Sequence, residues 1–241
     1  MQAKHKCFIS ACTGLCCIVV VHLVFLASIG HDCGHDSAKL LRLDASRRHI
    51  LMLGDSISQG MLRHLPVPPD ARVVHPCLNM TGGCANSARA VRCASQWVGN
   101  RSWDTIVFNF GMHDVGHTEE HTGLSSYVVN MRKVIALLRH HTADLVWVTT
   151  TPIPNQHRLP RRTQCDVLRY NDAVQKLVSN QNITTVDMFS FVRNACDTGL
   201  FFDSCPAMQI VGDIHFTPQG YQQMAQFLAS RVSLQQASSP V

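Results

Sequence analysis

Short apolar runs alternate with segments of helical periodicity along most of this chain. The apolar runs predict buried strands at residues 49–54, 72–75, 105–110, 144–150 and 183–186. Apolar residues three and four positions apart predict helices at residues 57–65, 88–98, 124–141, 167–178 and 217–232. Strands that alternate with helices form parallel sheets with helices on both faces. The pattern therefore predicts an α/β fold, a doubly wound parallel sheet of about five strands.

The apolar pattern at the N-terminus is different. Residues 7–29 form a run of 23 residues without Asp, Glu, Lys or Arg, and they follow a head, residues 1–6, that contains Lys4 and Lys6. This length predicts a transmembrane helix, and the basic head predicts a type II, single-pass protein with its domain in the lumen or outside. A cleaved signal peptide is the alternative, because the most apolar core, residues 18–29, is only 12 residues long. Both interpretations export the domain, to the Golgi, the cell surface or the medium.

The remaining boundaries follow from composition. Residues 30–47 are polar, lack a sustained period and predict a stalk. The domain proper is expected at residues 48–232, and residues 233–241 are expected to form a flexible tail.

Cysteines and glycosylation motifs agree with export. Asn79, Asn100 and Asn182 each begin an Asn-x-Ser/Thr motif. Beyond the apolar run the chain has seven cysteines, so it can form at most three internal disulfides and one thiol is left over. Their spacing does not match a zinc site, and no metal or other cofactor is expected.

The net charge of the chain does not favour a nucleic-acid partner. The net charge of +5 falls to +3 beyond residue 30, because 21 − 2 = 19 basic residues then face 16 acidic ones. A balance so weak and dispersed does not predict nucleic-acid binding. The arginines at 158, 161 and 162 are interpreted as a solvated loop.

Polar motifs follow the predicted strands, where ligands bind in sheets of this kind. Gly54-Asp55-Ser56 follows the first strand, a glycine loop at residues 82–83 follows the second, and Gly111-Met112-His113-Asp114 follows the third. All three motifs are therefore expected at one edge of the sheet. A serine at a strand-to-helix turn is held where its hydroxyl can meet a ligand, so Ser56 is a candidate nucleophile.

A fourth motif precedes the last predicted helix. Residues 212–218 read Gly-Asp-Ile-His-Phe-Thr-Pro, and a loop at this position can return to the same edge. A serine hydroxyl needs a base, and imidazole suits that task near neutral pH. His215 is thus the candidate base, and Asp213 could orient it.

These four motifs, in this order, resemble the SGNH (GDSL-type) hydrolases over residues 48–232. The resemblance implies a flavodoxin-like three-layer α/β/α sandwich and metal-independent ester hydrolysis through an acyl-serine. It assigns Ser56 as nucleophile, His215 as base and then acid, and Asp213 as the partner of His215. The oxyanion donors would be the backbone N–H groups of Ser56 and Gly83 and the side chain of His113.

The chain departs from the family pattern at two of these positions. His113 stands where the family has Asn, and an imidazole N–H can still donate a hydrogen bond. Asp213 lies two residues before His215 where the usual spacing is three, with Gly212 at the usual position, so a Ser-His dyad stays open. Any residue of the 82–86 loop could supply the donor assigned to Gly83.

The sequence thus predicts an exported serine esterase acting on an ester substrate, an acylated glycan or a lipid. Acetyl esters on glycans are favoured, and two further residues of the strand-end motifs, Asp55 and Asp114, are assigned to substrate binding. A lysophospholipase or thioesterase of the same fold is the alternative within the class. A non-catalytic binding module is the alternative from another class, and the retention of both Ser56 and His215 argues against it.

Overall fold

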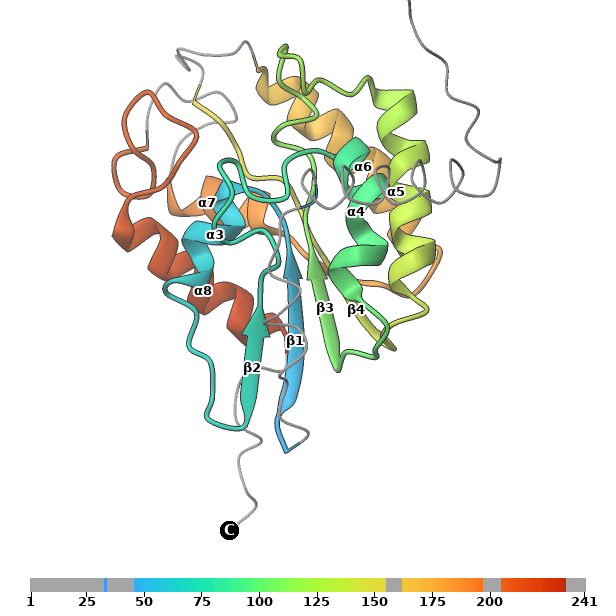
Figure 1. The fold of residues 1–241 in the computed structure, drawn as a ribbon. Coiled ribbons are helices and arrows are strands. Elements are labelled where there is room, and N and C mark those ends of the chain that lie inside the picture. Colours follow the sequence, from blue (N-terminus) through green and yellow to red (C-terminus); the bar gives the residue numbers. More distant parts are fainter. Residues whose placement is uncertain (1–32, 34–45, 155–161, 197–204, 233–241) are drawn as a thin grey trace, which may run out of the picture.

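A computed structural model describes residue 33 and residues 46–154, 162–196 and 205–232. Its five strands are parallel and lie in the order β2-β1-β3-β4-β5 (Figure 1). This is the flavodoxin-like order, in which the chain reverses direction across the sheet between β1 and β3. The strands are β1 (Arg48–Leu53), β2 (Ala71–Val74), β3 (Thr105–Phe108), β4 (Asp144–Val148) and β5 (Thr184–Val186). The prediction of a parallel sheet of five strands is confirmed.

The helices of the described ranges fall into two groups on opposite sides of the sheet. Helix α5 packs against both α4 and α6, whereas α8 packs against both α3 and α7 (Figure 1). Their bounds are α3 (Ser56–Leu62), α4 (Ser87–Val98), α5 (Leu124–Leu138), α6 (Gln164–Ser179), α7 (Met188–Ala195) and α8 (Pro218–Arg231). Helix α7 was not predicted from the sequence, because an apolar segment of eight residues is too short for its period to be recognised.

The core lies between the sheet and the two helical layers. The central strands are buried along almost their whole length, with Leu51, Ile106 and Trp147 each 0% exposed. Such strands have no solvent-facing side, which explains why they appear in the sequence as continuous apolar runs.

Three disulfides join six of the described cysteines, and the seventh, Cys165, is free and exposed. The pairs are Cys33–Cys93, Cys77–Cys84 and Cys196–Cys205. This pairing uses the largest number of internal disulfides that the cysteine count permits.

Several predictions lie outside the described residues. They are the head at 1–6, the apolar run at 7–29, the stalk at 30–47 apart from residues 33, 46 and 47, and the tail at 233–241. Among the helices that the structure does describe, none has the length and apolar character needed to cross a bilayer. The anchor therefore stays a prediction.

Candidate active site

The turn from β1 into α3 presents Ser56 at the start of the helix. Asp55 is the N-cap residue, and its Oδ1 accepts hydrogen bonds from the backbone N–H groups of Ile57 (2.9 Å) and Ser58 (3.4 Å). The first N–H groups of a helix have no acceptor within the helix itself. Since Asp55 takes those of Ile57 and Ser58, the N–H of Ser56 remains to face a ligand.

A hairpin before α8 brings His215 to this serine. Gln209 and Phe216 form an antiparallel bridge, and the Ile210 N–H donates to the His215 carbonyl oxygen (3.0 Å). Folded in this way, the hairpin places His215 Nε2 2.9 Å from Ser56 Oγ. The two residues are 159 positions apart in the chain, and the structure brings them into hydrogen-bonding contact.

Asp213 completes a chain of hydrogen bonds. Its Oδ1 lies 2.7 Å from His215 Nδ1 and also accepts the His215 backbone N–H at 3.1 Å. Burial acts to raise the pKa of Asp213, but the hydrogen bonds from the His215 backbone and ring outweigh it and leave the pKa below its ordinary value. The aspartate is therefore ionised at neutral pH and reaches the histidine despite the two-residue spacing.

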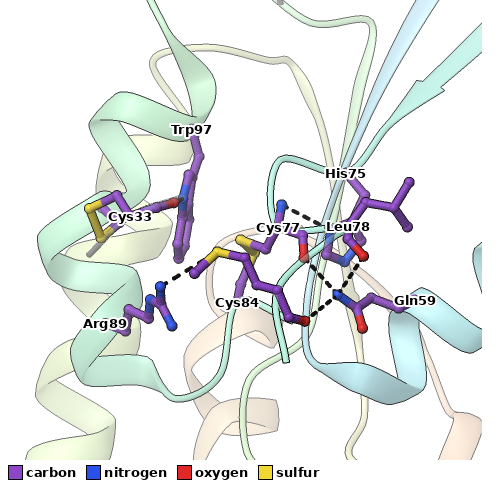
Figure 2. Close-up of a disulfide and its surroundings, with 10 residues drawn as sticks. Cys33, Gln59, His75, Cys77, Leu78, Cys84, Arg89 and Trp97 are labelled. Carbon is purple, nitrogen blue, oxygen red and sulfur yellow. Dashed lines mark hydrogen bonds between the residues drawn. A yellow bond between two sulfur atoms is a disulfide. The ribbon is translucent and has the colours of Figure 1, made fainter. Parts of the chain in front are cut away.

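A disulfide and several hydrogen bonds hold the loop between β2 and α4 in place (Figure 2). The Cys77–Cys84 disulfide closes it, and the side-chain amide of Gln59 in α3 donates to three of its carbonyl oxygens. These carbonyls belong to Cys77 (2.6 Å), Leu78 (3.1 Å) and Met80 (3.0 Å). The helix that begins with Ser56 thus also holds the glycine loop.

Within this loop the structure favours Gly82 over Gly83 as the oxyanion donor. The Gly83 N–H already donates to the Met80 carbonyl oxygen (3.0 Å), so our choice of Gly83 needs correction. Among the described residues no backbone carbonyl oxygen accepts the N–H of Gly82, and a Cβ on Gly82 would lie 3.0 Å from His113 Cε1. The sequence could not separate these neighbours, because the difference lies in the turn geometry.

His113 borders Gly82 from the end of β3. Its Nδ1 contacts the Glu120 carboxylate, and the edge of its ring that carries Cε1 and Nε2 faces Gly82. The side chain of His113 is 15% exposed and that of Glu120 is 48% exposed. The His113 side chain therefore lies beside the glycine loop, with Nε2 on the side of Gly82.

The two carboxylates that we assigned to substrate binding have structural roles instead. Asp55 is 1% exposed and caps α3, and Asp114 is 0% exposed. Asp114 accepts hydrogen bonds from the backbone N–H and the hydroxyl of Ser87, the first residue of α4. Burial raises the pKa of Asp114. This assignment is corrected, because neither carboxylate has a surface that a substrate could touch.

Near the site, sequence reasoning missed Gln59 and Glu120, and it interpreted Arg162 only as part of a solvated loop. Arg162 Nε donates to the carbonyl oxygen of Met112 (2.8 Å), so it contacts the segment that carries His113 instead of being only a solvated charge. Gln59 lies one helical turn after Ser56, which is the only sequence signal among the three. Arg162 is distant in sequence from its partner Met112, and Glu120 lies in a loop without a hydrophobic period.

One group of side chains in the described chain has the composition of a metal site. His75, Cys77 and Cys84 are all buried, and their ligand atoms lie within 4.8 Å of one another. Both cysteines are joined in a disulfide, so neither offers the thiolate that a metal would need (Figure 2). His75 Nδ1 accepts the Cys77 N–H (3.3 Å), and burial lowers the pKa of His75 to about 4, so it is neutral at pH 7.

Comparisons with known proteins identify the family and agree with the fold. The model of the GDSL-like Lipase/Acylhydrolase family matches residues 52–223. A protein from Streptococcus pneumonia that is proposed to be a platelet activating factor has a TM-score of 0.64 at 16% identity, over 91% of this chain and 99% of that chain. The acetylxylan esterase Axe2 from Geobacillus stearothermophilus has a TM-score of 0.59 at 16% identity, over 81% of this chain and 98% of that one.

A lipase/acylhydrolase from Enterococcus faecalis also has a TM-score of 0.59, at 14% identity, over 77% of this chain and 95% of that one. At such identities the likeness to these structures concerns the fold. No curated protein sequence matches the chain.

Proposed function

Because the chain belongs to the GDSL-like lipase/acylhydrolase family, we propose that it is an ester hydrolase in which Ser56 forms an acyl-enzyme. The observation that carries this proposal is the hydrogen-bond chain from Ser56 Oγ through His215 to Asp213, with distances of 2.9 and 2.7 Å. A serine is a weak nucleophile until a base in contact with it takes its proton. This arrangement supplies the base and the group that orients it.

The reaction has two halves. His215 Nε2 takes the proton of Ser56 Oγ while Oγ bonds to the ester carbonyl carbon, and the carbonyl oxygen becomes an oxyanion. The ester C–O bond then breaks, and His215 gives its proton to the leaving alcohol. In the second half a water loses its proton to His215 and attacks the acyl carbon, the bond between that carbon and Ser56 Oγ breaks, and His215 gives its proton back to Oγ. The Asp213 carboxylate stabilises the imidazolium of His215 in both halves.

Three groups are the proposed donors to the oxyanion. The N–H of Ser56, the N–H of Gly82 and the side chain of His113 belong to segments that follow β1, β2 and β3, three neighbouring strands of the sheet. One such donor typically contributes about 10²–10³ to the rate.

Acetyl esters on glycans are the proposed substrate. The likeness to the fold of an acetylxylan esterase supports this choice, as does the predicted export, because exported domains meet glycans. The export itself, by a type II anchor at residues 7–29 or by secretion after cleavage, is part of the proposal. No nucleic-acid partner is proposed.

A lipid ester is the second candidate, favoured by one observation. Ile210 and Val211, in the hairpin that carries His215, are 46% and 70% exposed. Two exposed apolar side chains near a catalytic base could contact an acyl chain or a lipid surface.

Labelling with a fluorophosphonate tests the nucleophile. The wild-type protein is expected to be labelled at neutral pH, and Ser56→Ala is expected to lose the label, whereas Ser95→Ala, a change at an exposed serine of α4, keeps it. Labelling that does not depend on Ser56 would contradict the proposal and favour a binding module of the same fold. Release of acetate from acetylated oligosaccharides, measured beside release of long-chain fatty acid from a lysophospholipid, then separates the two substrate candidates.

A further inference from the structure

The side chain of His113 can donate to an oxyanion only from Nε2. Its other nitrogen, Nδ1, contacts the Glu120 carboxylate, and an ionised carboxylate only accepts hydrogen bonds. Nδ1 therefore carries a proton. In the neutral ring the second nitrogen would then be a bare acceptor, and its lone pair would face the developing negative charge.

The doubly protonated ring removes this conflict. In the imidazolium both nitrogens are donors, so Nδ1 can bind Glu120 while Nε2 donates on the side of Gly82. Neutral asparagine, the residue that the family has at this position, donates from its amide without any such requirement. A histidine in this place thus needs a partner that asparagine does not need.

We propose that Glu120 is a positioning residue that holds His113 as an imidazolium, with Nε2–H directed at the oxyanion of the proposed ester hydrolysis. Glu120 does not contact the substrate and acts only through the imidazole ring of His113. The effect of Glu120 on catalysis rests on the proposed function, whereas the double protonation of the His113 ring does not.

The segment that carries Glu120 is itself held in place. The Glu120 carbonyl oxygen accepts a hydrogen bond from the side chain of Asn86 (2.7 Å), and its N–H donates to the Thr118 hydroxyl (3.3 Å). Asn86 is the N-cap residue of α4. Glu120 is therefore anchored to the helical layer through its backbone and leaves its carboxylate for His113.

Other charged groups surround this pair. Asp114, next to His113 in the chain, is buried and interacts electrostatically with it. Arg162 interacts electrostatically with Glu120, and its Nε is bonded to the carbonyl oxygen before His113. No titratable side chain from the disulfide-closed glycine loop, residues 77–84, faces the ring, because that segment contains none apart from its paired cysteines. Glu120 is the carboxylate in hydrogen-bonding contact with the ring.

A kinetic comparison tests the catalytic role. Glu120→Ala is expected to lower kcat for an activated acetyl ester by about 10²-fold, the scale of one oxyanion donor, with KM unchanged. The matched control is Glu119→Ala, a change at the exposed neighbouring glutamate, which is expected to leave kcat unchanged. Equal kcat values for the two variants would overturn the proposal, and thermal unfolding of both variants checks that they fold.

A double-variant cycle separates positioning from general stability. In a His113→Asn background, Glu120→Ala is expected to cost no further activity, because the amide donates without a carboxylate. His113→Ala provides a second background with the donor removed, in which the same result is expected. An equal loss in the wild-type and variant backgrounds would show that Glu120 acts on something other than His113.

The ring itself gives a further readout. Nitrogen-15 NMR of the wild-type histidine side chains is expected to show both nitrogens of His113 protonated. The spectrum is recorded at the pH at which fluorophosphonate labelling of the wild type is strongest. A bare Nε2 there would overturn the inference without any need for turnover. Absence of Ser56-dependent hydrolysis together with a doubly protonated ring would instead contradict only the proposed function.

Discussion

His75 shows what the fold does to a single side chain. It follows β2, is 5% exposed, and accepts the Cys77 N–H through Nδ1, while its Nε2 has no hydrogen-bond partner. Burial disfavours the charged ring and lowers its pKa from 6.5 to about 4. The folded chain therefore stays neutral at His75 in a pH range where the unfolded chain binds a proton.

This difference predicts an acid-sensitive contribution to stability. A lowered pKa contributes stability that is complete above pH 6.5 and is lost as pH falls towards about 4. The loss amounts to about 3 kcal/mol of unfolding free energy. His75→Asn, which keeps an acceptor and cannot titrate, is expected to lose less stability over this range than the wild type. Urea unfolding at several pH values measures it, with the exposed His64→Asn as control. Equal pH dependence in His75→Asn and the wild type would refute the prediction.

At the scale of elements, α3 and the glycine loop behave as one unit. Gln59 binds the loop from the helix, and the Cys84 N–H donates to the Gly54 carbonyl oxygen (2.8 Å). Gly83 has a φ of +64°, and a Cβ there would lie 2.6 Å from the carbonyl carbon of Asp55. The loop can therefore approach the nucleophile turn only with glycine at this position.

A matched pair of substitutions tests this unit. Gly99 has a similar φ of +63°, but a Cβ there would meet nothing within 4 Å. Gly99→Ala is expected to cost only the backbone strain of a φ of +63° with a ψ of −167°, about 1–3 kcal/mol. Gly83→Ala adds a collision with backbone and is expected to cost about 2–5 kcal/mol in total and to abolish fluorophosphonate labelling. Thermal unfolding and labelling of both variants measure this, and indistinguishable variants would contradict it.

At the scale of the whole molecule, the disulfides and the glycosylation motifs bear on the proposed export. Three disulfides are formed, and such bonds persist in oxidising environments. The asparagines of all three motifs, Asn79, Asn100 and Asn182, are exposed. Both features fit a domain that passes through the secretory pathway.

Glycan occupancy is therefore the prediction at this scale. The full chain, made in a cell with a secretory pathway, is expected to carry N-linked glycans at these three asparagines. Each Asn→Gln change at a motif should remove one glycan, whereas Asn180→Gln, at an exposed asparagine outside any motif, should remove none. Mass measurement before and after endoglycosidase treatment gives the answer. An unmodified chain would contradict the predicted export.

Much of the element order could be predicted because it depends on local periodicity. All five strands were found, although the predicted ends at residues 110 and 150 lie beyond the observed ends of β3, at Phe108, and of β4, at Val148. Phe110, two residues beyond β3, is 0% exposed without being in a strand. A buried loop residue and a buried strand residue are equally apolar, so the apolar pattern could not mark the boundary.

The sequence by itself determined the alternation of strands and helices and the residue types able to act as nucleophile and base. Both follow from properties that each segment carries locally, namely hydrophobic period and side-chain chemistry. The tertiary structure alone decided that Asp213 reaches His215, that Gly82 has the available N–H, and that Glu120 contacts His113. These outcomes depend on backbone turns and on distances between segments far apart in the chain, which no local pattern encodes.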